Sequence, residues 1–407
     1  MISIPFTPLC GYDNCVKPKI IIVGAGPAGT SLAIRLALKG FSPVLIERER
    51  FPRQKLCGEF ISPECLRHFD DLGVSDSMLS AGGDHIFETR FYEPGGKSIS
   101  VPSKLFGGGS ALSLSRARMD LNLLDRAKAV GVTVLEETKA AGLSRKNESV
   151  WELKVRHGDG TSSGIEAGII VDATGRAGII SKLLGEKSFN GKSKPGRNSY
   201  VGFKSHLRNV NLEKGGCEIY SFRGGYGGLS CIEDGLANHC FLVRSEVVRE
   251  FESDTGRILN ELIFENKRAS ETLKDSVPAA KYLAVAVDSF GVKNLSPASG
   301  ILAVGDSAAF IDPFTGSGML MAFESAEILA DCLSRGHSSF EATAADYHRL
   351  HAKTFSRRLR ISSLLRRVAF SPYFAKSAIS ILGVSRVSRE LLARATRQSF
   401  KLTENKS

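Results

Sequence analysis

Residues 19–47 read KIIIVGAGPAGTSLAIRLALKGFSPVLIE, and this stretch decides the fold. An apolar, β-branched run precedes Gly24-x-Gly26-x-x-Gly29, and a helix-like segment then leads to a second apolar run that ends at Glu47. This order of strand, glycine turn, helix and strand is typical of dinucleotide-binding α/β proteins. Gly24 permits a tight turn, Gly26 lets a pyrophosphate approach the backbone, and Gly29 lets the helix pack closely on the strand.

The residues after the glycines complete a predicted nucleotide site. Pro27 and Ala28 begin the expected helix, whose unpaired N–H groups and positive dipole end favour an anion. Glu47 follows Gly29 by eighteen residues, where its carboxylate can accept a hydrogen bond from a ribose hydroxyl, and Arg48 comes next to it. We therefore predict that these residues bind a dinucleotide.

Composition favours a cytoplasmic protein without a metal centre. No run of eighteen uninterrupted apolar residues occurs, and the first eighteen residues have neither a basic segment nor a continuous apolar one. We expect the eight cysteines to be free thiols, because they form no CxxC pair, and the eight histidines show no metal-binding spacing. The cysteines are Cys10, Cys15, Cys57, Cys65, Cys217, Cys231, Cys240 and Cys332.

The positive charge is concentrated near the C-terminus. The formal net charge is +11, and residues 351–407 hold thirteen Lys or Arg against two acidic residues. We favour a helical cap that docks its apolar face on the body and leaves its arginines in solvent. The alternative is a basic amphipathic helix on an anionic membrane, peripheral at the inner membrane surface. No nucleic-acid motif accompanies the charge, so we expect no nucleic-acid partner.

The pattern along the chain predicts an α/β fold in two interleaved domains. The expected Rossmann-like domain comprises residues 18–75, 105–190 and 285–345, and it ends with a buried strand, a loop and a long helix from about Met319. A strand-rich antiparallel domain, which we expect to bind substrate, comprises residues 76–104 and 191–284. It includes FRGGYGGLS, which we interpret as a glycine-rich turn. Residues 346–407 form the basic helical region.

Five motifs in this order resemble the FAD-dependent oxidoreductases with a glutathione-reductase-type FAD domain, and most closely the geranylgeranyl reductase family, which is related to class A flavin monooxygenases. The match covers residues 19–335. Besides the glycine fingerprint, the motifs are FPRQKLCGEFISP (51–63), RARMD (116–120), VDATGR (171–176) and GDSAAFIDPFTGSG (305–318). None lies after Leu350, so we expect FAD binding to be independent of the tail.

The resemblance implies which residues hold FAD. Asp306 would accept from a ribityl hydroxyl, Gly316 and Gly318 would let the backbone approach the isoalloxazine ring, and the helix from Met319 would point its N-terminus at the ring. Arg116 would also reach the cofactor. The other motif residues predicted to contact FAD are Lys55, Cys57, Gly58, Asp172, Gly175 and Pro313.

Cys57 is the predicted catalytic residue. In geranylgeranyl reductases the cysteine of the matching K-x-C-G motif lies beside the flavin and is implicated in the proton step of double-bond reduction. A thiol can deliver a proton as a hydride arrives on the neighbouring carbon. The other interpretation is a structural cysteine in a loop that covers the flavin. Glu59 departs from the reductase pattern and resembles the GES loop of flavin-dependent halogenases.

The aromatic motifs of both groups are missing. Where reductases carry GYxWxFP and halogenases carry WxWxIP, this chain has Gly225-Tyr-Gly-Gly-Leu-Ser-Cys231, and its one tryptophan is Trp151. A halogenase is therefore not expected. Gly228 in place of an indole would open the pocket above the ring. We predict that Tyr226 takes part in catalysis and that it lines this pocket with Phe203, Tyr220 and Phe222.

Three functions remain open at this stage. In the first, NAD(P)H reduces bound FAD, which then exchanges a hydride with a small apolar substrate. In the second, reduced FAD activates O₂ and the protein is a monooxygenase that hydroxylates an aromatic or polyketide-like substrate. The third is a flavin-binding electron carrier without a small substrate. The flavin carries the chemistry in all three, and the sequence does not separate NADH from NADPH or give the oligomeric state.

Overall fold

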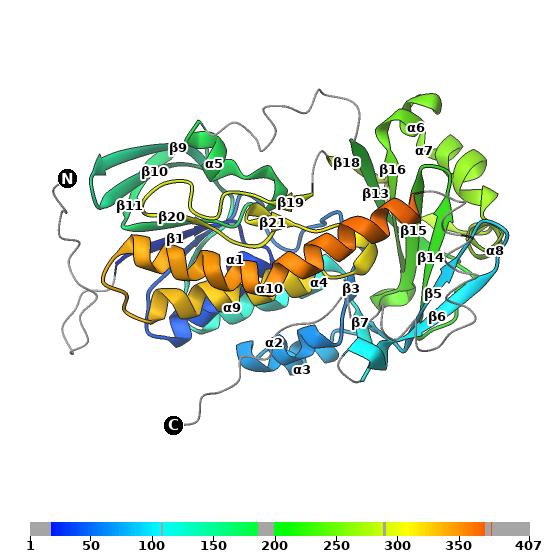
Figure 1. Ribbon diagram of the computed structural model, residues 1–407, viewed down its shortest axis with the longest axis horizontal. Coiled ribbons are helices and arrows are strands. Elements are labelled where there is room, and N and C mark those ends of the chain that lie inside the picture. The colour runs from blue at the N-terminus through cyan, green and yellow to red at the C-terminus, as the bar shows by residue number, and fades with distance from the viewer. Residues whose placement is uncertain (1–17, 107–108, 186–198, 288–289, 371–375, 377–407) are drawn as a thin grey trace.

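The chain folds into a parallel α/β domain joined side by side to a large antiparallel sheet (Figure 1). The computed structural model describes residues 18–106, 109–185, 199–287, 290–370 and residue 376. The predictions for Cys10, Cys15 and most of the basic tail lie outside these residues. The six cysteines in the described part of the chain are all free, as expected.

Five parallel strands form the centre of the α/β domain in the order β20-β12-β1-β2-β8. Their bounds are Ile20–Val23 for β1, Val44–Ile46 for β2, Thr133–Leu135 for β8, Ile169–Asp172 for β12 and Ile301–Ala303 for β20. All four residues of β1 are buried, because both faces of the sheet are covered. Ile20 and Ile22 pack in the cluster that contains the helices, whereas Ile21 and Val23 pack against an antiparallel meander.

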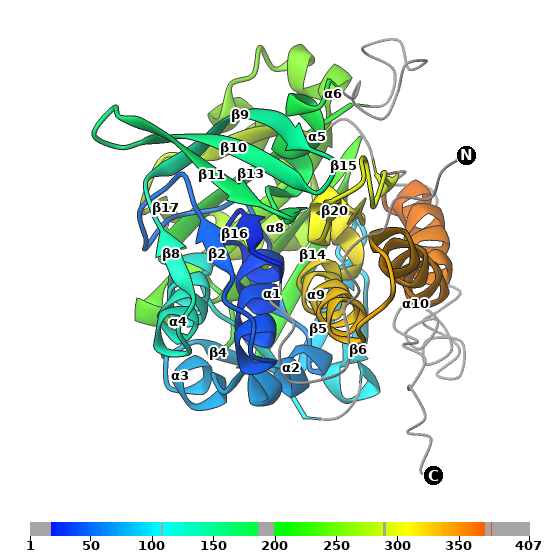
Figure 2. The same cartoon turned by 90° about the vertical axis from the view of Figure 1, so that its left-hand side faces the viewer.

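The two coverings of this sheet are visible in Figure 2. On one side lie α1, α4 and α9, and on the other lies the meander β9-β10-β11. The meander strands are Thr138–Asn147, Val150–His157 and Ser162–Ala167. The helices are α1 Pro27–Leu38, α2 Glu64–Leu72, α3 Ser75–Leu79, α4 Arg116–Ala129, α5 Ile179–Leu183, α6 Ser245–Glu250, α7 Thr255–Arg257, α8 Lys267–Leu273, α9 Gly318–Ser334 and α10 Phe340–Ala369.

The second domain is an eight-stranded sheet in the order β17-β13-β16-β15-β14-β5-β6, with β18 also paired to β13. All its pairings are antiparallel except that of β14 with β5. Its strands are β5 Glu88–Tyr92, β6 Ser98–Pro102, β13 Tyr200–Arg208, β14 Gly216–Phe222, β15 Gly225–Cys231, β16 Ala237–Arg244, β17 Val277–Pro278 and β18 Leu283–Val287. The mixed α/β fold and the interleaved strand-rich part are as predicted.

The glycine-rich segment is a strand, and our interpretation of FRGGYGGLS as a turn was wrong. Only Arg223 and Gly224 form the turn, while Gly225–Cys231 is β15, paired on both edges. Crowding explains the glycine at Gly225, where a Cβ atom would lie 2.4 Å from the Leu242 carbonyl oxygen and 2.5 Å from the Phe222 ring.

Two small sheets complete the fold. One has the order β3-β7-β4, from Phe60–Ile61, Ala111–Ser113 and Asp84–Ile86, and the other pairs β19 Gly291–Val292 with β21 Ala309–Phe310. Short 3₁₀ or π turns occupy Ser103–Phe106, Gly175–Ala177, Glu233–Gly235, Ile258–Leu262, Ile263–Glu265, Gly305–Ser307 and Pro313–Thr315. The proposed domain boundaries at 285 and 346 fall inside β18 and α10.

The basic C-terminal segment begins as the long helix α10, which packs against α9 (Figure 1). Its apolar face docks on the body, as predicted for residues up to 370, and Tyr347 and Phe355 are fully buried. Arg357 and Arg360 are exposed, as expected, but two other arginines differ from the expectation of solvation. Arg358 is buried and its Nη1 donates to Glu324 Oε2 of α9 at 2.6 Å. Arg366 lies over the Phe290 ring at 4.5 Å and 3.8 Å from Asp312.

Candidate active site

One large cavity of about 1510 Å³ is lined by residues of both domains. It begins at the carboxyl ends of β1 and β2 and reaches the face of the antiparallel sheet. All five sequence motifs contribute to its walls. It is lined by the predicted site residues Gly24, Gly26, Pro27, Ala28, Glu47, Arg48, Lys55, Cys57, Gly58, Arg116, Gly175, Tyr226, Asp306, Pro313, Gly316, Gly318 and Met319.

The turn into α1 has the form that a pyrophosphate requires. Gly24 has φ of 108°, and a Cβ atom there would lie 2.4 Å from the Ala173 carbonyl oxygen. A Cβ atom on Gly29 would lie 1.9 Å from the Gly24 carbonyl oxygen, so helix and strand approach as closely as predicted. Gly29 itself does not line the cavity. At Gly26 the nearest atom to a Cβ position is Arg116 Nη2 at 3.9 Å, which leaves open space in front of the helix N-terminus.

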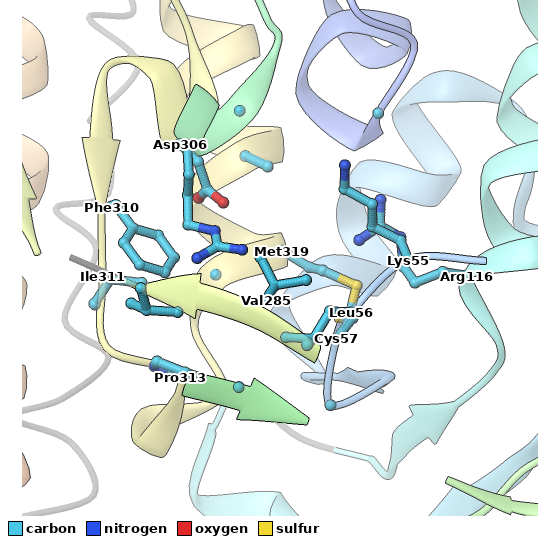
Figure 3. A pocket seen from close by; sticks show the side chains of 18 of the residues that line it. Lys55, Leu56, Cys57, Arg116, Val285, Asp306, Phe310, Ile311, Pro313 and Met319 are labelled. Atoms are coloured by element: carbon cyan, nitrogen blue, oxygen red, sulfur yellow. The ribbon is translucent and has the colours of Figure 1, made fainter. Parts of the chain in front are cut away.

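Lys55 and Arg116 supply positive charge beside this space (Figure 3). Lys55 faces the cavity. Its pKa is lowered because the surrounding protein excludes part of its water and because Arg53 and Arg116 are nearby. Arg116 is held by Asp120, with Nε and Nη2 donating at 2.8 and 2.7 Å. Although burial opposes its charge, Asp120 raises the pKa of Arg116. A bound pyrophosphate would relieve the excess of positive charge, so these residues fit the phosphates of FAD.

Glu47 lies at the end of β2 and fixes the turn as well as facing the cavity. Its Oε2 accepts from the Ala25 N–H at 2.9 Å and its Oε1 from the Glu49 N–H at 3.0 Å. The carboxylate is 6% exposed, and Arg53 lies 3.7 Å from Oε2. The position fits a ribose contact, and the two backbone bonds are a role that sequence reasoning missed.

We predict that Glu47→Ala weakens FAD binding by roughly 1–3 kcal/mol, because the ribose and the two backbone donors lose their acceptor in a closed site. Glu47→Gln keeps one side-chain oxygen and should lose less. The check is titration of the reconstituted apoprotein with FAD, followed by flavin fluorescence. An unchanged dissociation constant for the alanine variant would contradict the assignment.

The far end of the cavity fits the flavin ring and its ribityl chain. The Asp306 carboxylate points into it without a protein donor among the described residues, and burial raises its pKa (Figure 3). A ribityl hydroxyl would supply that donor. Gly316 has φ of 60° in the turn before α9, and α9 begins at Gly318, one residue earlier than predicted, with no side-chain cap. Its free N–H groups therefore face the cavity.

Asp172 differs from the prediction, because it does not line the cavity. It is fully buried, and its carboxylate accepts from Thr174 N–H at 3.0 Å, Ile180 N–H at 3.0 Å and Ser307 Oγ at 3.0 Å. It holds together the loop after β12, the start of α5 and the turn that carries Asp306. Its position at the end of a strand is typical of a cofactor-binding residue, but its carboxylate accepts hydrogen bonds from backbone N–H groups instead.

Cys57 lies where the cofactor groove meets the antiparallel sheet. The thiol is half-buried and lines the same cavity as Met319 and Val285 (Figure 3). The Glu59 N–H donates to its sulfur at 3.4 Å, and Asn238 Nδ2 donates to its carbonyl oxygen at 3.2 Å. The charge of Arg116 interacts with the same thiol. This position can deliver a proton into the cavity.

Tyr226 lines the cavity with its ring, while its hydroxyl is engaged elsewhere. The hydroxyl donates to Asp312 Oδ1 at 2.9 Å, and that oxygen also accepts from the Phe314 N–H at 2.9 Å. Burial raises the pKa of Tyr226 and raises that of Asp312 to about 6. Because the hydroxyl proton is donated to Asp312, the structure favours a wall residue over the catalytic role that we predicted for Tyr226.

The substrate end of the cavity is formed by one face of the antiparallel sheet. Cys217, Ile219 and Ser221 of β14 line it, while the alternate residues Tyr220 and Phe222 point into the core on the other face. Phe203 also packs in that core, so our prediction that these three aromatic residues line the pocket was wrong. Two-residue alternation along β14 could have separated the faces. Other lining residues that we missed are Thr89, Phe91, Ile99, Val101 and Cys240.

Gly228 lines the cavity but leaves less space than expected. Ile219 lies directly opposite it on β14, and a Cβ atom at Gly228 would be 3.0 Å from Ile219 Cδ1. The isoleucine side chain therefore occupies part of the volume that the missing indole would leave. This end of the cavity is predominantly apolar.

The comparisons with known proteins agree with this geometry. Residues 17–351 match the FAD binding domain family. The chain belongs to that family. This FAD-binding protein is an FAD-dependent oxidoreductase, as the resemblance implied.

Relatives of this FAD-dependent oxidoreductase include reductases and halogenases. A digeranylgeranylglycerophospholipid reductase from Methanosarcina mazei is 25% identical over 350 residues, which is 81% of this chain and 76% of the relative. A geranylgeranyl bacteriochlorophyll reductase-like structure from Thermoplasma acidophilum has a TM-score of 0.75 at 20% identity and covers 94% of this chain and 96% of its own. A flavin-dependent brominase has a TM-score of 0.77 at 17% identity, with 95% and 94% covered. The two structures show the shared fold.

Proposed function

We propose that this FAD-dependent oxidoreductase takes reducing equivalents from NAD(P)H and transfers a hydride to a small apolar substrate. The observation that carries the proposal is the continuity of the cavity, which leads from the cofactor groove past Cys57 to apolar side chains of β5, β6 and β14. A flavin carrier without a substrate has no use for this second compartment. The names of the reductase relatives support a lipid-like, apolar substrate.

The residues of the chain have separate tasks in this scheme. Bound FAD would supply the hydride chemistry. The α1 N-terminus, Lys55 and Arg116 would hold the phosphates, and Asp306 and the α9 N-terminus would hold the other end of the cofactor. The apolar wall excludes water from the substrate. Cys57 gives its proton to the substrate carbon beside the one that receives the hydride, and the S–H electron pair stays on sulfur.

The test compares turnover of the purified enzyme with NADPH and NADH, each with and without O₂. We expect that an apolar substrate with a carbon–carbon double bond is reduced in the absence of O₂. A strict requirement for O₂ and incorporation of its oxygen into the product would instead establish the monooxygenase alternative on an aromatic or polyketide-like substrate. Oxidation of NAD(P)H without any effect of substrate would favour the carrier.

We predict that the purified protein is yellow and that its FAD is bound without a covalent link. The resemblance provides no His, Cys or Tyr for attachment to the flavin. Acid precipitation should therefore release all the colour, and the released flavin should be FAD, because the groove provides a pyrophosphate site that FMN would not use. A yellow pellet or recovery of FMN would refute this prediction.

A membrane contact is proposed for α10, at the inner surface of the cytoplasmic membrane. Its outer face exposes a stripe of basic residues with Leu364, which is 61% exposed. Residues three or four apart lie on one side of a helix. The stripe consists of Arg349, Lys353, Arg357 and Arg360. None of the described helices is long and apolar enough to cross a bilayer, so the proposed contact is peripheral.

We predict that Lys353→Glu/Arg360→Glu lowers binding to phosphatidylserine vesicles at least about tenfold, since each basic residue near such a surface contributes about 1 kcal/mol. Sedimentation with vesicles at low and high salt measures it. The control Lys154→Glu/Arg156→Glu makes the same charge change on β10. Equal losses for both variants would attribute the binding to net charge alone.

A further inference from the structure

A buried ionic cluster lies next to Cys57, and its residues have no role in the proposed reaction. Glu59 is fully buried on the Cys57 loop, and Lys204 of β13 is 2% exposed. Lys204 Nζ donates to Glu59 Oε1, and His206 Nε2 lies 2.8 Å from Glu59 Oε2. Burial alone would raise the pKa of Glu59, but His206 and Lys204 outweigh it and lower that pKa. Glu59 is therefore a buried carboxylate anion with two basic partners.

Lys204 is committed to the loop and is not among the cavity-lining residues. Besides Glu59, its Nζ donates to the Lys55 carbonyl oxygen at 3.1 Å and to Gln54 Oε1 at 3.4 Å, so three acceptors use its three protons. The amine is thus unavailable to a substrate. On the same strand, Gly202 leaves room for the Leu56 side chain, since a Cβ atom there would lie 3.1 Å from Leu56 Cδ2.

These contacts tie a loop of the FAD-binding domain to the antiparallel sheet. The tie determines the conformation of Glu59, which has φ of 54°, a value that costs a residue with a side chain free energy. In this conformation the Glu59 N–H donates to the Cys57 sulfur. Glu59 Oε1 also accepts from the Arg116 N–H at 2.8 Å, at the first residue of α4. Glu59 thus contacts the sulfur through its own N–H, and its carboxylate fixes the backbone of Arg116, whose guanidinium interacts with the thiol.

We propose that Glu59 is a positioning residue for Cys57. Lys204 and His206 clamp its carboxylate, so that the Glu59 N–H and the Arg116 guanidinium face the sulfur and stabilise the thiolate that remains after proton transfer. The proposal rests on the proposed role of Cys57. After each turnover, water restores the proton to the sulfur.

The charged and titratable groups around Cys57 come from every neighbouring element. The Arg116 guanidinium on α4 interacts with the thiol, and the negative charge of Glu59 is paired with Lys204. Cys240 on β16 is also close, and burial raises its pKa to about 12, so it stays neutral. His206 is paired with Glu59, and Lys55 lies on the same loop as Cys57. Glu59 and Lys204 carry opposite charges. A variant that removes both therefore breaks the ion pair without changing the net charge near the thiol.

The test uses the double variant Glu59→Gln/Lys204→Met as the FAD-containing holoenzyme. Alkylation of Cys57 by iodoacetamide is followed against pH, with peptide mass spectrometry to separate it from the other cysteines. Loss of an N–H donor to a thiolate should move the midpoint of the alkylation profile about half to one unit to higher pH. Below the midpoint, the alkylation rate should fall about three- to tenfold. His206→Gln keeps a donor to Glu59 and should show a smaller shift.

The matched control is Glu218→Gln/Arg268→Met, which removes an ion pair between a buried carboxylate and a partly exposed guanidinium on the opposite face of the sheet. Glu218 accepts two bonds from Arg268, at 2.9 and 2.7 Å, and does not line the cavity. This control variant should lose a comparable amount of stability, and the pH profile of Cys57 alkylation should be unchanged in it. An unshifted profile in the first variant, or equal shifts in both, would overturn the proposal. So would a wild-type Cys57 that does not react at any pH, because a proton donor must be reachable from the cavity. The profile needs no substrate, so its outcome is independent of the proposed reaction.

Discussion

Replacing Cys57 with serine is expected to slow the substrate half-reaction by about 10²–10⁴ and to leave the reduction of FAD by NAD(P)H at nearly the normal rate. The serine hydroxyl has a similar size but is a much poorer acid. In the proposed reaction, only the substrate step needs a proton at this position. Bound FAD should be unchanged, since the phosphate and ribose contacts that we propose come from the α1 turn, Lys55, Arg116 and Glu47.

Stopped-flow measurement of the two half-reactions separates these effects. Cys231→Ser is the control, because Cys231 is also half-buried but lies on β15 outside the cavity lining. If both half-reactions of Cys57→Ser are unchanged, the residue is structural and the monooxygenase alternative gains support. If FAD is lost, the loop itself is part of the cofactor site.

The second large effect is expected at Arg358, far from the chemistry. Arg358→Met should lower the free energy of unfolding by about 3–5 kcal/mol, because the buried Glu324 carboxylate loses its guanidinium partner. Urea denaturation followed by circular dichroism measures the change. Arg360 is two residues further along α10, on its exposed side, and Arg360→Met should change the free energy of unfolding by less than about 0.5 kcal/mol.

A double variant shows whether the loss comes from the unpaired charge. Glu324→Leu/Arg358→Met removes both charges and should recover most of the stability, since apolar residues often replace a buried ion pair without net cost. A loss below about 1 kcal/mol in the single variant would contradict the assignment. The result decides whether α10 is an integral part of the body.

The contacts of α10 change our expectation for the tail. No cofactor motif lies after Leu350, but Leu365 lines the cavity and Arg366 lies 3.8 Å from Asp312 in the loop that precedes α9. The same Asp312 accepts the Tyr226 hydroxyl. A deletion after Leu350 would remove these contacts, so independence of FAD binding from this helix no longer follows from the motifs.

The sequence by itself determined the fold class, the cofactor and most of the groove that holds it. Gly24 and Gly29 are informative because a Cβ atom there would collide with the backbone, and Gly26 is informative because it leaves room for a pyrophosphate. Such constraints are local in sequence. The five motifs place their residues by short-range geometry within one strand–turn–helix unit or one loop. Most of the predicted cofactor residues accordingly line a single cavity.

The tertiary structure alone decided how side chains from distant segments meet. In the folded chain the Asp172 carboxylate accepts from backbone N–H groups, and the Tyr226 hydroxyl donates to Asp312. Arg358 is buried against Glu324, and Lys204 and His206 contact Glu59. In each case a polar group removed from water takes the partner that packing provides, and these partners lie between 2 and 147 positions away in the sequence. Residue type and local spacing predict that such a group needs a partner, while only the packed fold determines which one it finds.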